Sequence, residues 1–381
     1  MKRTMKKMVS MALTGTMAVA VLAGAGTSEV KAADKAKIGV LVADVSGEEA
    51  QGFRSYYENY IAGNYDVEFN YTDALKSAED EKTAIEKFAS QGCQAIISFS
   101  SNDRVQQIET CEKYGVYYAV ASGVLDDAQY ETYKTYEYFA GQVGPGNDTE
   151  FEAGKDMGAY YKEQGVSKVA IYGAFIPNPM HVYRVAGVLN GLGCTYGGES
   201  DMNAIAGQIF QDQTVDLSKV EGDVEVVSYL QGYGDTTTDE LNAAIQKTPD
   251  AFISVGMATT FFAQSLSEAG ISFSDIDSFT ETNGNSMKNG TLTYLAGKYS
   301  SSIGPVFALV MNAINGNVIR DEDGNAPSIS QGYLVATDSD TFDKYSVSDS
   351  GDAPIYDKET LDSIIGDNVT FEDVKTLVES K

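Results

Sequence analysis

The sequence has no tryptophan, one histidine and three cysteines in 381 residues, and these absences exclude several classes of enzyme. Zinc sites are built from clusters of cysteine and histidine, and no cluster with zinc spacing occurs. A Ser-His-Asp triad would have to use His181, and the Gly-x-Ser-x-Gly nucleophile turn is missing. There is also no Gly-Lys-Ser/Thr phosphate loop. We therefore expect no catalytic residues, no cofactor and no bound metal.

Positive charge is scarce. The chain carries 27 lysines and arginines against 55 aspartates and glutamates, which gives a formal net charge of −28. A surface this acidic repels the phosphates of nucleic acids and the headgroups of anionic membranes. We therefore expect neither nucleic acid nor a membrane surface among the partners.

Long apolar runs are missing after the N-terminus. Four basic residues among the first seven precede an apolar run over residues 8–24, and residues 30–32 offer a small-x-small cleavage site. This pattern predicts a signal peptide over residues 1–32 and an exported protein, periplasmic or at the cell surface. Residues 22–25 (LAGA) read either as a lipoprotein box with alanine in place of the lipidated cysteine, or as a chance match.

The cysteines of an exported chain raise the question of a disulfide. Cys93 precedes an apolar strand, and Cys111 lies near the end of the next helix, which in a βα unit returns beside the start of that strand. Cys93 and Cys111 are therefore the disulfide candidate, and Cys194 would remain as a small buried apolar residue. Spacing does not supply the Cα separation of about 4.4–6.8 Å that a disulfide requires, so the free and bridged forms both stay open.

Apolar strands alternate with amphipathic helices along the chain, which is typical of a parallel sheet with helices on both faces. The first series begins with KIGVLV over residues 37–42, and the pattern restarts after residues 144–147 (GPGN). Two such series, with no Pro- or Ser-rich linker, predict an α/β protein of two doubly wound parallel-sheet lobes joined by a multi-segment hinge. The predicted parts are a signal peptide (1–32), an N-terminal lobe (33–143 plus 299–330), a C-terminal lobe (144–298 plus 331–345) and a C-terminal helical extension (346–381).

Five sequence blocks resemble the type I periplasmic sugar-binding proteins, the group that includes ribose- and galactose-binding proteins. The blocks are KIGVLVADVSGEEAQGF, AIEKFASQGCQAIISFSSND, KEQGVSKVAIYGA with YRVAGVLNGL, TPDAFISVGMATTFFAQSLSEAGI, and NGTLTYLAGKYSSSIGPVFALVMNAINGN. They occur in the family's order and cover nearly all of residues 37–340. The resemblance implies two lobes that close on a ligand held at the carboxyl ends of their strands.

Two departures from the family bear on the ligand. Sugar binders usually carry an aromatic-rich stretch after the first strand, where residues 46–50 read SGEEA, and an Asn-Asp pair where residues 256–257 read Gly-Met. That aspartate commonly binds sugar hydroxyls, so its absence puts a pentose or hexose in doubt. At the same positions the chain is similar to the basic membrane protein, or nucleoside-binding, branch.

The resemblance implies an extracytoplasmic substrate-binding protein of an ABC transporter. Its partners would be a small-molecule ligand, such as a sugar or nucleoside-like solute, and an ABC permease in the membrane. We expect a monomer. The alternative is a sensor subunit of the same fold that delivers its closed state to a membrane receptor, and the sequence does not separate the two.

Three candidate ligand-binding residues follow the first strand, namely Asp44, Ser46 and Glu49. Paired acids suit the hydroxyls or the amine of a ligand. The same residue types suit a helix N-cap and first turn, where the helix dipole favours acids, so both interpretations stay open.

The densest cluster of short polar side chains follows the third strand and contains Ser101, Asn102 and Asp103. For these residues we favour ligand contact over helix capping. Ser122 occupies the equivalent place one strand later.

The second lobe supplies the other candidates. Asn178, His181 and Arg184 run from a strand end into a helix, and Arg184 sits where the resemblance puts a ligand-contacting or lobe-facing arginine. A lone histidine is more often a surface or packing residue than a site group, so His181 keeps both interpretations. The remaining candidates are Tyr233, Met257, Asn283 and Tyr299.

Overall fold

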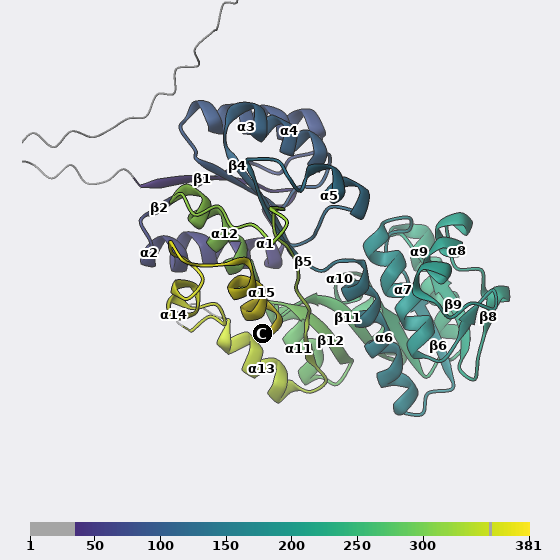
Figure 1. Cartoon of the computed structure of the whole chain (residues 1–381). Coiled ribbons are helices and arrows are strands. Elements are labelled where there is room, and N and C mark those ends of the chain that lie inside the picture. The colour runs from purple at the N-terminus through teal and green to yellow at the C-terminus, as the bar shows by residue number, and fades with distance from the viewer. Residues whose placement is uncertain (1–34, 350–352) are drawn as a thin grey trace, which may run out of the picture. The chain divides into compact units, whose positions relative to one another are not determined.

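The computed structural model describes residues 35–349 and 353–381 (Figure 1). The predicted signal peptide lies outside these residues. Within them, no helix combines the length and apolar character needed to cross a membrane. The described chain forms two six-stranded sheets with helices packed on them, so the predicted α/β class with parallel-sheet lobes is confirmed.

The first sheet has the strand order β13-β5-β4-β3-β1-β2, and all its neighbouring strands are parallel. Its central strands are buried on both faces, because successive side chains such as Ile96 and Ile97 enter two different apolar clusters. Such strands read as continuous apolar runs, as KIGVLV does. The strands are β1 (Ala36–Leu41), β2 (Val67–Tyr71), β3 (Ala95–Ser98), β4 (Tyr117–Ala121), β5 (Phe139–Gly144) and β13 (Ser328–Ser330).

Helices cover both faces of the first sheet. The cluster that contains Ile96 takes buried side chains from α3 and α4, and the cluster that contains Ile97 takes them from η1, α12, α14 and α15. The elements are α1 (Glu48–Ser55), the π-helical turn η1 (Tyr56–Ile61), α2 (Ala62–Asn64), α3 (Ala78–Ser90), α4 (Arg104–Tyr114), α5 (Asp127–Tyr133), the 3₁₀ turn η3 (Ser300–Ile303), α12 (Gly304–Ile314), α14 (Lys358–Asp362) and α15 (Phe371–Glu379).

The second sheet has the strand order β14-β12-β11-β10-β6-β9 and is parallel except for β14, which runs antiparallel to β12. Its strands are β6 (Lys168–Tyr172), β9 (Glu225–Leu230), β10 (Ala251–Ser254), β11 (Ser272–Ser278), β12 (Leu292–Lys298) and β14 (Leu334–Ala336), and β7 (Thr195–Tyr196) pairs with β8 (Val220–Glu221) beside it. The helices of this part are α6 (Asn147–Glu163), α7 (Pro179–Gly191), α8 (Met202–Asp212), η2 (Leu217–Lys219), α9 (Asp235–Gln246), α10 (Ala258–Ala269), α11 (Glu281–Lys288) and α13 (Ser339–Ser348).

In the described residues, successive strands of the two large sheets lie in different sheets three times, after β5, after β12 and after β13. The run GYLVA over residues 332–336 indicates a strand in the sequence, and β14 lies there, whereas β13 has no such signal. β13 lies at a sheet edge and has only three residues, two serines around one isoleucine. It therefore carries no apolar run that would identify it.

Helices α6 and α7 lie in close contact because glycines occupy the contact positions. A Cβ atom added to Gly154 would lie 2.0 Å from the carbonyl oxygen of Arg184, and one added to Gly187 would lie 2.0 Å from that of Phe151. No larger residue fits such an approach of two backbones. The contact places Glu150, in the first turn of α6, beside Arg184 on α7.

Candidate functional site

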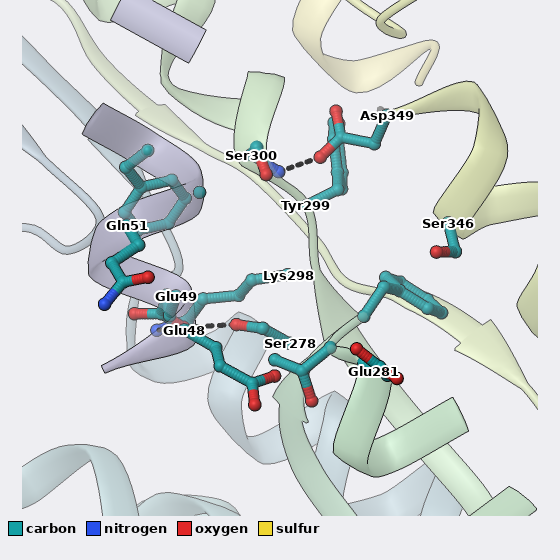
Figure 2. Close-up of a pocket in the computed structure, with 14 residues that line it drawn as sticks. Glu48, Glu49, Gln51, Ser278, Glu281, Lys298, Tyr299, Ser300, Ser346 and Asp349 are labelled. Carbon is teal, nitrogen blue, oxygen red and sulfur yellow. Dashed lines mark hydrogen bonds and ion pairs between the residues drawn. The ribbon is translucent and has the colours of Figure 1, made fainter. Parts of the chain in front are cut away.

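Two adjoining cavities lie at the carboxyl ends of strands from both sheets. In each sheet the order of the parallel strands reverses once, between β1 and β3 and between β6 and β10, and doubly wound sheets bind ligands at that point. The first cavity, drawn in Figure 2, has a volume of about 430 Å³ and the second about 420 Å³. Both volumes suit a small molecule. The residues that line both are Glu48, Glu49, Thr280 and Lys298.

The loop after β1 is organised by Asp44. Its carboxylate accepts hydrogen bonds from the Ser46 amide at 2.9 Å, the Ser46 hydroxyl at 3.0 Å and the Gly47 amide at 2.9 Å. The bond from the Ser46 amide is the main reason that the pKa of Asp44 lies below its ordinary value. Asp44 lines the second cavity, yet its observed bonds hold the turn from which α1 begins.

Glu48 and Glu49 reach from the first turn of α1 to the second sheet. Glu49 Oε2 accepts a hydrogen bond from the Ser278 hydroxyl at 2.6 Å and lies 3.7 Å from Lys298 Nζ (Figure 2). Glu48 Oε1 accepts one from the Thr282 hydroxyl at 3.0 Å. Glu48 and Glu49 line both cavities, so the two glutamates form a wall that the cavities share.

Two carboxylates come from β11, Asp275 from its middle and Asp277 from next to its last residue. Asp275 is fully buried and accepts hydrogen bonds from the Ser254 hydroxyl and the Thr259 amide, both at 3.0 Å. Burial raises the pKa of Asp275 to about 7, and the nearby charge of Asp277 adds to the rise. Asp277 lines the second cavity. Burial raises the pKa of Asp277, the hydrogen bond from the Asn283 amide lowers it, and the Glu49 carboxylate raises it.

Two buried polar atoms beside the second cavity have no hydrogen-bond partner, Thr259 Oγ1 and Asn283 Oδ1. The Asn283 side chain is 1 % exposed, and its Nδ2 donates to the Ser278 carbonyl at 2.8 Å and to Asp277 Oδ2 at 3.3 Å. Because both neighbours of Nδ2 are acceptors, the amide orientation is fixed and Oδ1 is the atom left without a donor. Buried polar atoms are rarely left unpaired in proteins, which marks this corner as a place for a ligand.

Arg184 lines the second cavity, but most of its hydrogen-bonding capacity is used within the protein. Its Nε lies 2.6 Å from Glu150 Oε2, its Nη2 lies 2.6 Å from the Tyr333 hydroxyl, and its Nη1 donates to the Val255 carbonyl at 2.8 Å. The Tyr333 hydroxyl also donates to Glu150. The charge of Arg184 is therefore balanced before any ligand arrives.

His181 is buried beside Arg184 and lines the second cavity. Its Nδ1 lies 3.1 Å from both the amide nitrogen and the carbonyl oxygen of Phe175. Burial, reinforced by the positive charge of Arg184, lowers the pKa of His181 to about 4. The imidazole is thus neutral near pH 7, and Nδ1 is used within the protein.

The polar loop after β3 is held by a buried carboxylate that sequence reasoning missed. Glu81 Oε1 accepts from the Ser100 hydroxyl at 2.5 Å and from the Asn102 amide at 2.9 Å, and its Oε2 accepts from the Asp103 amide at 2.9 Å. Asp103 caps α4 through the Gln106 amide. The observed hydrogen bonds of this cluster hold the loop and cap α4, and ligand contact by Ser101, Asn102 and Asp103 stays a prediction.

The structure brings together only part of the predicted set. Ser46 binds Asp44, Ser122 adopts a left-handed backbone with φ 58°, and Asn178 caps α7. Tyr233 is 68 % exposed and stacks on Phe261. The predicted residues that line the second cavity are Asp44, Glu49, His181, Arg184, Met257 and Asn283, and Tyr299 lines the first. Those that line neither are Ser46, Ser101, Asn102, Asp103, Ser122, Asn178 and Tyr233.

The disulfide candidate is not formed in the structure. Cys93, Cys111 and Cys194 are all free and buried. Cys93 and Cys111 belong to the same apolar cluster, where they pack as separate thiols, and burial raises the pKa of Cys93 to about 11. In residues 35–349 and 353–381 no group of histidine, cysteine and acidic side chains is arranged to hold a metal ion.

The cavities also contain acids and polar groups that sequence reasoning did not select. Asp277 is the residue before the last of β11, and Thr259 lies in the first turn of α10, whose sequence reads as apolar packing. The available signal was position alone, since both residues lie at or just after the carboxyl end of a central strand of the second sheet.

No model of a known protein family matches the chain, and no curated protein matches it. Solved structures do match. The periplasmic binding protein of the arabinose ABC transporter from Shewanella sp. ANA-3 has a TM-score of 0.56 at 15 % identity, over 81 % of this chain and 93 % of that chain. A solute-binding protein from Bacillus halodurans with bound myo-inositol has a TM-score of 0.58 at 17 % identity, over 83 % and 99 %. One from Actinobacillus succinogenes with bound D-allose has a TM-score of 0.61 at 16 % identity, over 82 % and 100 %.

At such identities the likeness establishes the fold, which is that of the type I periplasmic sugar-binding proteins. The fold-level prediction from the sequence blocks is therefore confirmed.

Proposed function

We propose that the chain is an extracytoplasmic substrate-binding protein that captures a small polar solute, sugar-like or nucleoside-like, and delivers it to an ABC permease. The observation that carries this proposal is the second cavity, which lies between the loop after β1 of the first sheet and the segments that follow β6 and β10, at the switch point of the second sheet. Proteins of the same fold hold arabinofuranose, myo-inositol or D-allose. These polyols are of a size that cavities of about 420–430 Å³ admit.

The chemistry of the cavities suits such a solute. Hydroxyl groups donate hydrogen bonds to carboxylates, and Glu49 and Asp277 provide carboxylates in the second cavity. A ligand donor would also give Asn283 Oδ1 the partner it lacks. A buried polar atom left unpaired costs about 1–3 kcal/mol, so pairing it on binding favours the complex.

The three crossings between the sheets are the proposed hinge. The lobes would comprise residues 33–143 with 299–330 and residues 144–298 with 331–345, and residues 346–381 would form an extension. A ligand held by Glu49 from α1 and by Asp277 from β11 contacts both lobes. It would favour the closed arrangement by its extra affinity for that arrangement.

Several finer features belong to the same proposal. The chain would be exported after removal of residues 1–32, would act as a monomer without catalytic activity, and would not bind nucleic acid. The excess of acidic residues supports the last point, and the N-terminal pattern supports export.

A thermal-shift screen of the mature chain against sugars, cyclitols and nucleosides tests the proposal. A ligand at about 100 times its Kd adds about 2.7 kcal/mol of stability and should raise the melting temperature clearly. The variants Glu49→Gln and Asp277→Asn should reduce the shift given by the best compound. Glu131→Gln changes an exposed side chain on α5 that pairs with Lys134, and it should leave the shift unchanged, which makes it the matched control. If no compound of these classes shifts the melting temperature, the proposed function is wrong.

A further inference from the structure

The second cavity has an imbalance of charge that a neutral sugar would not relieve. Its carboxylates come from both sides, two from the first turn of α1, one from the loop before it and one from β11. The acidic residues are Asp44, Glu48, Glu49 and Asp277, and the basic residues are His181, Arg184 and Lys298.

The basic residues do not balance the acidic ones. Arg184 is paired with Glu150, which does not line the cavity, at 2.6 Å, and both side chains are only 3 % exposed. His181 is neutral near pH 7, since burial and Arg184 lower its pKa to about 4. Lys298 is the remaining cation that lines the cavity among the described residues, and it lies 3.7 Å from Glu49.

Glu49 and Asp277 lie near each other, because Glu49 Oε2 accepts a hydrogen bond at 2.6 Å from the hydroxyl of Ser278, the residue after Asp277. The Glu49 carboxylate adds to the rise in the pKa of Asp277, and Lys298 opposes that rise. Like charges held together in this way disfavour each other, and a cation placed between them would relieve both. Lys298 reaches Glu49 at 3.7 Å, a distance at which no hydrogen bond forms.

A second observation, independent of the charges, points to a donor-rich guest at the same place. The Asn283 side chain is 99 % buried and lines the cavity, and its Oδ1 accepts no hydrogen bond. Its Nδ2 is bound to Asp277, so the unpartnered acceptor belongs to the same corner as that carboxylate. An ammonium group has three donors and no acceptor, which matches a corner made of acceptors.

We infer that the guest is a polyol-like molecule with a protonated amine, such as an amino sugar or aminocyclitol, whose ammonium group binds between Glu49, Asp277 and Asn283. This inference rests on the proposed function and narrows its ligand class. The hydroxyls of the guest extend along the rest of the cavity, where Thr259 Oγ1 also lacks a partner.

The test uses the mature chain and matched compounds that differ at one substituent. D-glucosamine, D-galactosamine and D-mannosamine are each compared with the N-acetyl derivative and with the neutral parent hexose, by thermal shift and calorimetry near neutral pH. An aminocyclitol is compared with myo-inositol in the same way. We expect at least one amine to bind about tenfold more tightly than its neutral counterparts.

Variants separate charge from shape. Glu49→Gln and Asp277→Asn keep the size of the side chains and should reduce the preference for the amine over the neutral parent by about tenfold or more. Asn283→Leu should weaken binding of the amine. Glu131→Gln on α5 serves as the control and should leave the preference unchanged.

The outcomes are distinguishable. A neutral hexose or cyclitol that binds more tightly than its amine would overturn the inference and leave the proposed function standing. If Glu49→Gln and Asp277→Asn weaken amine and neutral compounds equally, the inference is also wrong. If no sugar, cyclitol or nucleoside binds, charged or neutral, the proposed function and this inference fail together.

Discussion

The guanidinium of Arg184 and the carboxylate of Glu150 form a buried ion pair, with Arg184 Nε 2.6 Å from Glu150 Oε2 and both side chains 3 % exposed. The Tyr333 hydroxyl joins both of them. Glu150 lies shortly after the first crossing between the sheets, and Tyr333 lies on the third. The ion pair therefore links two segments of the proposed hinge. The family resemblance implied a ligand-contacting or lobe-facing arginine at position 184, and the observed hydrogen bonds of Arg184 are made within the protein.

Replacing Glu150 should unfold the protein at lower denaturant. Glu150→Gln leaves the buried charge of Arg184 without its counter-ion, and breaking a buried pair in this way costs about 3–5 kcal/mol. Urea denaturation followed by circular dichroism measures the change. Glu152→Gln, two residues further along α6, removes an exposed pair with Lys155 and should cost less than about 1 kcal/mol. Equal midpoints for the two variants would contradict the account of this ion pair.

Glu81 should control the order of the loop after β3. In Glu81→Gln the side chain loses one acceptor oxygen and its charge, so the Asn102 and Asp103 amides, which now donate to Glu81, lose protection. We expect a loss of about 1–3 kcal/mol in stability and faster hydrogen exchange at these two amides. Glu79→Gln, exposed on the same helix, is the control. Unchanged exchange at both amides would show that the carboxylate does not hold the loop.

The contrast between Glu81 and the strands around it shows what could be predicted from the sequence. The strands and helices were predictable because apolar periodicity is local, as KIGVLV and the helix containing Ile85 and Phe88 show. Glu81 lies in an acidic run, AEDEK, that reads as an exposed helix face, yet its side chain is completely buried. Its partners in the loop lie about twenty positions later, and only the folded chain brings them together.

The candidate site was predictable in position and less so in detail. The rule that ligands bind beyond the carboxyl ends of the strands selected Glu49, His181 and Asn283, and these three residues line one cavity. It did not distinguish side chains that face the cavity from those that cap a helix. The capping residues Asp103 and Asn178 are also short polar residues that follow a strand. Contacts from other elements also shape these loops, as the bond from the Asp103 amide to Glu81 of α3 shows, and such contacts are not visible in the local sequence.

Asp275 should make the protein less stable as the pH rises. Its pKa is raised in the folded state to about 7. The ordinary value of an aspartate is about 3.9, so its contribution to stability is complete below about pH 4 and is lost as the pH rises through about 7. Asp275→Asn removes this loss. The free energy of unfolding of the variant, relative to that of the parent, should therefore rise by up to about 4 kcal/mol between about pH 4 and about pH 7.

Asp250 provides the comparison of opposite sign. Hydrogen bonds, first from the Ser167 amide and then from the Lys168 amide, hold its pKa below the ordinary value. Its contribution is present above about pH 4 and is lost at lower pH, so Asp250→Asn should show no gain between about pH 4 and 7. Urea denaturation at several pH values measures both variants. A flat difference between Asp275→Asn and the parent would show that Asp275 titrates normally.

Counting thiols distinguishes the three free cysteines of the structure from a chain in which Cys93 and Cys111 form a disulfide. The structure has Cys93, Cys111 and Cys194 free and buried, so a thiol reagent should react slowly with the native protein and should titrate three thiols in denaturant without reductant. The burial that raises the pKa of Cys93 to about 11 also lowers its thiolate fraction, which slows the native reaction further. A single thiol in denaturant would mean that Cys93 and Cys111 are bridged, and Cys93→Ser should then expose Cys111 to the reagent in the unfolded chain.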